Sequence, residues 1–236
     1  HPDVALPLGD SQYEDGTAEG YARSYAPSWG RLLSISRPAV GNHEYLTSHA
    51  SAYFDYFGAA AGERDKGYYS FNADSWHLIS LNSNCSQADG CKADSPQGRW
   101  LAADLAAHPT QCVLAYFHHP RWSHGEHGDN DGVAPFISTL YAAGAEVVLS
   151  GHDHDYERFT PLTPDGAPDP ARGVRQFVVG SGGRNHYRTT TGATTEGMNA
   201  DTFGVLQLTL RPGAYDWRFV PEAGGSYTDS GSANCH

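Results

Sequence analysis

Residues Ala145–Arg158 read AEVVLSGHDHDYER, an apolar run that leads into two histidines, His152 and His154, set among carboxylates. The apolar run has the length and composition of a buried strand, and Gly151 is a turn signal. Imidazoles and carboxylates gathered directly after a buried strand are suited to binding a ligand or a metal ion. The stretch therefore predicts an α/β fold with a polar site at a strand end.

The composition of the chain narrows the class of protein. It has 236 residues, 39% of them apolar, which is enough to bury a core as one domain over residues 1–236. The formal net charge is −12. Because this charge repels polyphosphate backbones, we expect no nucleic-acid partner and instead a small substrate. No run of about 18 apolar residues occurs, so we expect no transmembrane segment. The composition predicts no particular oligomeric state.

None of the four cysteines belongs to a CxxC pair, which argues against a zinc knuckle. Cys85 and Cys91 flank a small polar loop, NCSQADGCK, that a disulfide would close. A second bridge, from Cys112 to Cys235, would fix the polar C-terminal tail. Disulfides and a low lysine content favour a secreted, periplasmic or extracellular protein. The alternative is four unpaired thiols in a cytosolic enzyme.

Hydrophobic periodicity predicts alternating strands and helices in the first two-thirds of the chain and mostly strands thereafter. The clearest helix lies within residues 94–109, with Ser95 as its N-cap and Pro96 at its first position. This order of elements places the chain in the α/β class. The other expected elements are helices at 48–58 and 134–144, a hairpin over 67–83, a loop over 189–196, and strands at 4–10, 34–41, 111–120, 146–154, 174–183, 202–213 and 214–222.

Four of the expected strands end in a polar cluster. One histidine or aspartate after a strand is usually a turn or capping residue, but four such clusters at strand ends indicate a common site. Their oxygen and nitrogen donors, with no thiolate among them, match ions such as Zn, Mn or Fe. Two histidines in one loop can reach two ions, and Asp10, at the tight LGD turn, is the candidate carboxylate to bridge them. The clusters are Asp10–Tyr13, Asn42–Glu44, His118–His119 and His152–His154.

The motifs GDSQY, GNHE, HHP and GHDHDYER follow one another between Gly9 and Arg158. In this order they resemble the calcineurin-like metallophosphoesterases. The tyrosine three residues after the aspartate, and the ending HDYER, are similar to the purple acid phosphatase branch, of the secreted bacterial type. The resemblance implies a two-sheet β-sandwich flanked by helices, the αββα architecture of that family.

The resemblance also implies a centre of two metal ions, Fe, Zn or Mn. A phenolate ligand favours a trivalent ion, so Tyr13 would give a coloured ferric site; the alternative is that Tyr13 only packs beside the turn. The implied ligands are Asp10, which bridges both ions, Tyr13 and His154 on the first ion, and Asn42, His118 and His152 on the second.

Other residues would face the substrate. By resemblance, His43 would act as a general acid or phosphate hydrogen-bond donor, and Glu44 would orient it. His127 would be a further substrate-facing histidine, for which His124 is the alternative. Arg184 and His186 follow a glycine-rich strand end and are candidate substrate contacts, although such glycines are usually turns.

One departure from the family pattern concerns the start of the chain. The family has an earlier strand that carries an Asp ligand, and Asp3 would lie at the wrong end of its strand to replace it. We expect that the chain begins inside the domain, so that the domain is N-terminally incomplete here and an Asp-bearing strand is encoded upstream of His1. The alternative is a natural loss that leaves one metal or none.

The resemblance implies a function for the chain. It would be a secreted phosphatase that hydrolyses small phosphomonoesters by in-line attack of a metal-bound hydroxide. One alternative is a phosphodiesterase or a hydrolase of nucleotides or phospholipid head groups. Another is a non-catalytic binding protein on the same scaffold, made plausible by the absent Asp ligand.

Overall fold

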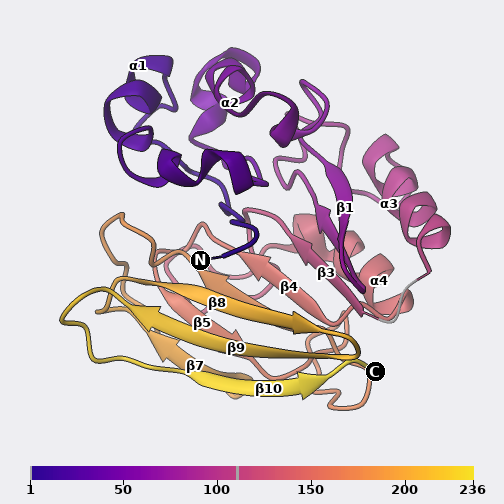
Figure 1. Ribbon diagram of the computed structural model, residues 1–236. Helices are drawn as coiled ribbons and strands as arrows, with labels where there is room; N and C mark the ends of the chain where they lie inside the picture. Colours follow the sequence, from indigo (N-terminus) through magenta and orange to yellow (C-terminus); the bar gives the residue numbers. More distant parts are fainter. Residues whose placement is uncertain (1, 110–111) are drawn as a thin grey trace.

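The computed structural model describes residues 2–109 and 112–236 and contains two β-sheets packed face to face, with helices outside them (Figure 1). The larger sheet has the strand order β1-β2-β3-β4-β6-β5-β7, and the smaller has the order β10-β9-β8. The strands are β1 Tyr69–Ala73, β2 Trp76–Ser80, β3 Cys112–Tyr116, β4 Val147–Ser150, β5 Tyr156–Phe159, β6 Arg175–Val179, β7 Thr195–Asn199, β8 Gly204–Arg211, β9 Ala214–Pro221 and β10 Ser230–Asn234.

The centre of the larger sheet is parallel, since β2, β3, β4 and β6 pair in the same direction. The outer strands β1, β5 and β7 run antiparallel to their neighbours. The carboxyl ends of β3 and β4 therefore meet at one edge, where the loops after both strands carry histidines.

The longer helices lie within the ranges that the sequence predicts, although α2 begins three residues later than expected, after the 3₁₀-helix Ser48–Ala50. Ser95 caps α3 (Pro96–Ala107) by accepting a hydrogen bond from the Gly98 N–H at 3.1 Å. The aromatic helix α2 (Ser51–Phe57) ends at Gly58, which has a positive φ of 55°. The remaining helices are α1 (Ala18–Gly20), α4 (Ala134–Ala142), a π-helix at Tyr21–Tyr25 and 3₁₀-helices at Trp29–Ile35, Glu44–Leu46, Ser48–Ala50, Gly58–Ala61 and Asp131–Val133. No helix among the described residues is long and apolar enough to cross a membrane.

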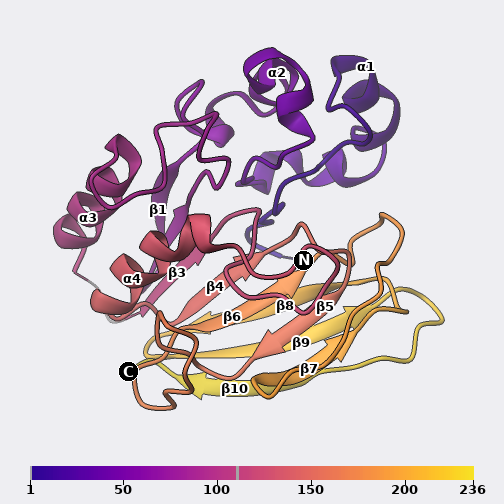
Figure 2. The same ribbon diagram turned by 180° about the vertical axis from the view of Figure 1, so that it is seen from behind.

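Alternating side chains of the central strands supply two separate cores. Val113 and Ala115 of β3 face α3 and α4, whereas Leu114 and Tyr116 face the smaller sheet. Figures 1 and 2 show the two sides: β8, β9 and β10 cover one face of the larger sheet, and α3 and α4 cover the other. The expected two-sheet sandwich flanked by helices is confirmed.

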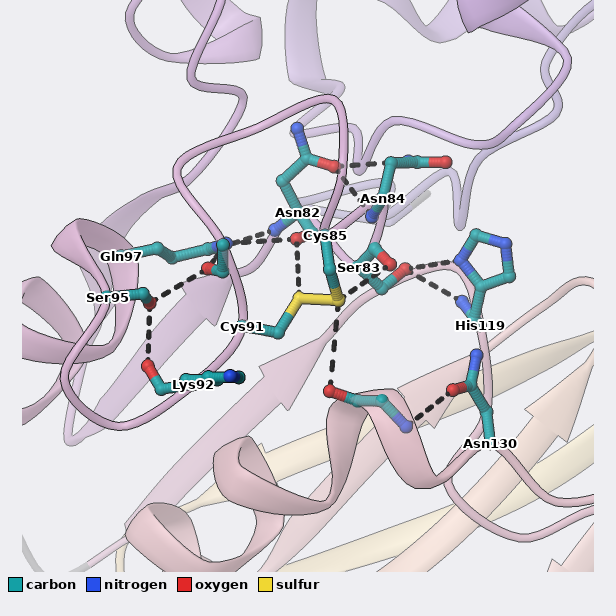
Figure 3. The surroundings of a disulfide bond; sticks show 12 residues. Asn82, Ser83, Asn84, Cys85, Cys91, Lys92, Ser95, Gln97, His119 and Asn130 are labelled. Atoms are coloured by element: carbon teal, nitrogen blue, oxygen red, sulfur yellow. Dashed lines mark hydrogen bonds between the residues drawn. A yellow bond between two sulfur atoms is a disulfide. The ribbon is translucent and has the colours of Figure 1, made fainter.

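Both expected disulfides are present, Cys85–Cys91 and Cys112–Cys235. The first closes the loop after β2, as Figure 3 shows, and the second joins the start of β3 to the end of the chain. The described cysteines are all paired, so the alternative of four unpaired thiols is wrong for this structure.

Several predicted elements differ from the structure. The strands expected at 4–10 and 34–41 are reduced to isolated parallel bridges, Ala5↔Ser36 and Leu8↔Ala39, because Pro7 and Pro38 lack the N–H that a ladder needs. The loop expected over 189–196 overlaps the start of β7, whose sequence TEGMN has no apolar alternation. The short strands β5 and β10 are not predicted from the sequence, and Gln111, where the expected strand 111–120 begins, lies outside the described residues.

Candidate metal centre

Four segments distant in sequence meet at the carboxyl ends of β3 and β4. The ring Nδ1 of His118 lies 2.8 Å from the Leu8 carbonyl, and the Gly151 N–H donates to the His118 carbonyl at 3.0 Å. The contact is close: a Cβ added at Gly9 would lie 2.5 Å from the His118 Nδ1. Asp10 and His152 have positive φ values of 50° and 69°, a backbone conformation that residues other than glycine rarely adopt.

The side chains around His118 form the first half of the centre. Since the His118 Nδ1–H donates to the Leu8 carbonyl, its Nε2 is the ring atom that faces the centre, and it becomes a ligand atom when the imidazole is neutral. This Nε2 lies 3.2 Å from Asp10 Oδ2, 2.9 Å from Asn42 Oδ1 and 3.2 Å from His152 Nδ1. Four atoms with lone pairs therefore converge, an arrangement that fits a divalent cation.

Tyr13 and His154 form the second half, on the other side of Asp10. The Tyr13 hydroxyl lies 3.1 Å from Asp10 Oδ2 and 3.0 Å from His154 Nε2. The His154 Nδ1–H donates to the Asn185 carbonyl at 2.8 Å, so its Nε2 lone pair faces Tyr13. Within residues 2–109 and 112–236, no carboxylate other than Asp10 is hydrogen-bonded to Tyr13 or His154.

The electrostatic surroundings keep Asp10 and His152 in their ligand forms. Burial, and then the neighbouring His118, lowers the pKa of His152 to about 2, so that imidazole is neutral. Burial alone would raise the pKa of Asp10, but His118 and the His43 backbone N–H hold it below its ordinary value. Asp10 is therefore ionised, and His152 presents a free lone pair, as metal ligands must. Burial, and then the Asp10 carboxylate, raises the pKa of the Tyr13 hydroxyl, and Asp10 outweighs burial to raise the pKa of His118, so a metal ion would displace a proton from each.

We expected Glu44 to orient the His43 side chain, but its carboxylate is hydrogen-bonded to other groups. Its fully buried carboxylate accepts the backbone N–H groups of Gly41, Asp10 and Ser11 at 2.7–2.9 Å, and the Tyr21 hydroxyl at 3.1 Å. A buried carboxylate needs such donors, and the two glycine turns supply the three backbone N–H groups. Glu44 therefore joins the two loops that present Asp10 and Asn42, and does not orient His43.

His43 itself lies at the edge of the centre. Its backbone N–H donates to Asp10 Oδ1 at 2.9 Å, and its ring packs on Tyr13 with centroids 4.5 Å apart. The ring Nδ1 is bonded to the Glu14 carbonyl. The ring is half-buried, so it can face a substrate bound beside Asp10.

The two alternative histidines of the loop after β3 are placed differently. The His127 ring packs 4.2 Å from that of His152, and its Nδ1 lies 2.8 Å from Asp153 Oδ1. The His124 ring stacks on Phe159 and its Nδ1 lies 3.0 Å from Glu157 Oε2, behind the centre. His127 is thus the histidine that the structure brings to the centre.

Sequence reasoning assigned no roles to Asp153, Glu157, His119 and Tyr187. Asp153 and Glu157 are fully buried, and their carboxylates accept hydrogen bonds from backbone N–H groups of the loop 123–127. Their alternation with His152 and His154 in the sequence could have indicated that they face away from the centre. One ring nitrogen of His119 lies within 4.8 Å of ligand atoms of His118 and His152. Tyr187 stacks on His154 with centroids 3.9 Å apart, and no sequence pattern marked it.

Of the two candidate substrate contacts, Arg184 lies near the centre. Its guanidinium sits 4.8 Å above the Tyr13 ring and pairs with Glu14 at 2.5 Å. The His186 ring packs on Phe203 with centroids 4.1 Å apart. Arg184 is therefore available to a ligand at the centre, whereas His186 takes part in packing.

The fold is a two-sheet sandwich, and the loops at its strand ends bring histidine, asparagine and tyrosine side chains around one aspartate. These features are those of a metallophosphoesterase. The chain belongs to the calcineurin-like phosphoesterase family, whose sequence profile matches residues 1–156. Within that family of metal-dependent phosphoesterases, it belongs to the purple acid phosphatase-like branch.

The individual similarities support this placement. Purple acid phosphatase 21 of Arabidopsis thaliana is 30% identical over 205 residues, which cover 77% of this chain and 44% of that protein. The structure of purple acid phosphatase PPD1 from yellow lupin (Lupinus luteus) seeds matches with a TM-score of 0.79 at 16% identity, covering 98% of this chain and 46% of that chain. This chain thus spans less than half the length of these two phosphatases.

A third similarity is to GAP50 of Plasmodium, whose structure is described as the anchor in the inner membrane complex. Its TM-score is 0.66 at 13% identity, covering 99% of this chain and 89% of that chain. At 13% and 16% identity, these two structural similarities show a shared fold.

Proposed function

We propose that this chain is the catalytic domain of a secreted phosphatase that hydrolyses phosphomonoesters at a centre of two metal ions. The observation that carries the proposal is the convergence of lone-pair atoms on both sides of Asp10, from His118, Asn42 and His152 on one side and Tyr13 and His154 on the other. The family match supports it. The two disulfides support an oxidising compartment.

Each ion would have its own ligands. Asp10 would bridge both ions, and its carboxylate would offset part of their combined charge. Tyr13 and His154 would bind the first ion, and Asn42, His118 and His152 the second. Bound ions would supply an activated water and polarise the phosphoryl oxygens.

The surrounding side chains would position the phosphoryl group and move a proton. His43 and His127 flank the centre, so their ring N–H groups would hold phosphoryl oxygens as negative charge develops. His43, held through its Nδ1 by the Glu14 carbonyl, would protonate the leaving alkoxide. Arg184 would add a positive charge at the rim, over Tyr13.

The first ion, beside Tyr13, would be ferric iron, because a phenolate ligand favours a trivalent ion. The second ion would be Fe, Zn or Mn. Iron-loaded protein would then absorb visible light through a tyrosinate-to-iron transition, and Tyr13→Phe would remove the band. Metal-loaded protein that stays colourless but turns over substrate would contradict the iron assignment alone.

Two other functions remain as alternatives. A phosphodiesterase, or a hydrolase of nucleotides or phospholipid head groups, would use the same centre with a wider approach. A non-catalytic binding protein is favoured by one observation, the similar fold of GAP50, which is described as an anchor.

Turnover of two generic substrates separates these functions. Full-length protein loaded with iron and zinc is assayed on an aryl phosphate and on a bis-aryl phosphate. We expect kcat/KM to be at least about tenfold higher on the monoester, since a diester lacks one of the charged oxygens that the centre would bind. A higher value on the diester would favour the diesterase, and fully metallated protein without turnover on either would leave the binding protein.

A further inference from the structure

A second cluster of metal-ligating side chains lies away from the centre, where α3 packs beside β1 at the outer part of the larger sheet (Figure 1). His77 is the second residue of β2, so it lies at the opposite end of this strand from the loops of the centre. Asp104 and His108 lie one helical turn apart at the carboxyl end of α3. The cluster is therefore independent of Asp10 and its neighbours.

The three side chains are in contact. The His77 Nε2 lies 2.8 Å from Asp104 Oδ2, and the His108 Nδ1 lies 3.3 Å from Asp104 Oδ1. The His108 Nδ1–H donates to the Asp104 backbone carbonyl at 2.9 Å, so an ion would bind the His108 Nε2 or replace this proton. The two imidazoles stack with centroids 4.6 Å apart and an interplanar angle of 16°. One ligand atom from each residue falls within 4.8 Å of the other two, as in the group formed by His118, His119 and His152.

The hydrogen bonds behind the cluster orient the His77 ring toward it. As Asn72 is placed, its Oδ1 accepts a hydrogen bond from the His77 Nδ1–H at 2.7 Å, so the Nε2 is the ring atom that faces Asp104 Oδ2, at 2.8 Å. Without a metal ion these two atoms share a proton, and a bound metal ion would take the place of that proton. The other Asp104 oxygen accepts from the Ser70 hydroxyl at 2.7 Å. In metal sites, the ligating histidines and carboxylates are usually held in place by hydrogen bonds to outer residues, as His77 and Asp104 are here.

The local charge also favours a cation. The side chains of His77 and Asp104 are only 1% and 8% exposed, so water screens them little. The last turn of α3 carries partial negative charge and contains no lysine or arginine. His108 is 43% exposed and can move toward an ion that enters from solvent.

We propose that His77, Asp104 and His108 bind one divalent transition-metal ion, best matched by Zn²⁺, in a site separate from the proposed dinuclear centre. Two imidazoles and one carboxylate are zinc ligands, and water would fill the fourth position. Ligand atoms on one tetrahedral zinc stand about 3.3 Å apart, so the cluster closes by about 1.5 Å or less when the ion binds. The ion joins the end of α3 to β2.

The test counts zinc ions in the full chain. Wild-type protein and the variant His108→Ala are dialysed against micromolar Zn²⁺ and analysed for zinc per chain. We expect the wild type to hold one equivalent more than His108→Ala, and Zn²⁺ to raise the melting temperature of the wild type more. His108 is at the surface, so we expect the two proteins to melt alike in EDTA.

The control variant is His49→Ala, which removes another exposed histidine with a carboxylate neighbour, Asp65, at 3.9 Å. It should keep the wild-type zinc count. Equal zinc content and equal stabilisation in wild type and His108→Ala would overturn the proposal, as would an equal loss in His49→Ala. The difference in zinc per chain between wild type and His108→Ala does not depend on the dinuclear centre. A failure of the proposed function would appear separately, as a lower zinc content in all three proteins alike.

Discussion

At the scale of single residues, alternate side chains of the motif GHDHDYER contact two different parts of the molecule. His152 and His154 face the candidate centre, and Asp153 and Glu157 turn the other way to hold the loop of residues 123–127. The positive φ of His152 marks the turn from which the two imidazoles reach opposite sides of Asp10. The carboxylates of the motif therefore position the loop that carries His127.

Replacement of His43 and of His152 should have different effects. His43→Ala should lower kcat by about 10²–10³ with metal content unchanged, because His43 would donate a proton and bind no metal. His152→Ala should lose metal together with activity. Elemental analysis of both variants beside turnover measurements checks this, and equal metal loss in the two would refute the division of roles.

His127 and His124 form a matched pair. Because the His127 ring packs on His152 while His124 packs on Phe159, His127→Ala should lower kcat about tenfold or more. His124→Ala should change kcat by less than about threefold, since the His124 ring packs on Phe159 and pairs with Glu157 rather than with the residues around Asp10. Kinetics on an aryl phosphate decide this, and a larger loss in His124→Ala would reverse the assignment.

At the scale of elements, much of the fold could be predicted from the sequence where local signals are strong. The Ser95 cap, the hairpin of β1 and β2, and the helix α4 follow from capping, alternation and turn residues, and the structure confirms them. The strands β5, β7 and β10 lack these signals because they are short, have no regular apolar alternation and form by pairing with distant neighbours. Their pairing depends on tertiary structure, which single-sequence periodicity does not report.

The site was predictable for a different reason. The residue types and their positions after apolar strands indicated that Asp10, Asn42, His118, His152 and their neighbours come together, and the structure brings them together. The contacts of Glu44 could not be predicted, because its position next to His43 in sequence says nothing about the backbone donors that the glycine turns supply. Tyr187 was equally hidden, in a loop with no periodicity.

The two disulfides should contribute unequally to stability. In the loop-entropy description, Cys112–Cys235, with a separation of 123 residues, constrains the unfolded chain by about 5 kcal/mol, and Cys85–Cys91, with a separation of 6, by about 2 kcal/mol. Replacing Cys112 and Cys235 by alanine should therefore lower the midpoint of denaturant unfolding more than replacing Cys85 and Cys91. The opposite order would contradict this account of how the tail is fixed.

At the scale of the whole molecule, Arg158 joins the larger sheet to the C-terminal part of the chain. Its guanidinium bonds Asp229 at 2.7 and 3.0 Å and lies 5.0 Å above the ring of Trp217 in the smaller sheet. The Tyr156 hydroxyl donates to the same carboxylate at 2.6 Å. The last residues of the family motif thus hold the two sheets together.

This contact predicts a pH dependence of folding. Burial would raise the pKa of Asp229, but hydrogen bonds from Arg158 and Tyr156 outweigh it and lower that pKa below its ordinary value. The contribution of Asp229 to stability is therefore complete above the unfolded pKa, about 3.9, and is lost as pH falls through the lower folded pKa. Asp229→Asn should cost about 2 kcal/mol at pH 7, because Arg158 loses its charge-assisted hydrogen bonds to Asp229 and keeps Glu196 as its charged partner.

Denaturant unfolding of wild type and Asp229→Asn at pH 7 and at pH 3 measures this. The difference in free energy of unfolding should be smaller at pH 3, where protonation weakens the wild-type pair. A difference that is the same at both pH values would show that Asp229 contributes through packing alone.

The central claim is that the side chains around Asp10 hold two metal ions, and anomalous diffraction from a crystal of metal-loaded protein tests it most directly. We predict two anomalous peaks about 3.5–4 Å apart. The Asp10 carboxylate should lie between them, with Tyr13 and His154 on one and Asn42, His118 and His152 on the other. A single peak, or none within reach of Asp10 in protein loaded with excess metal, would contradict the account.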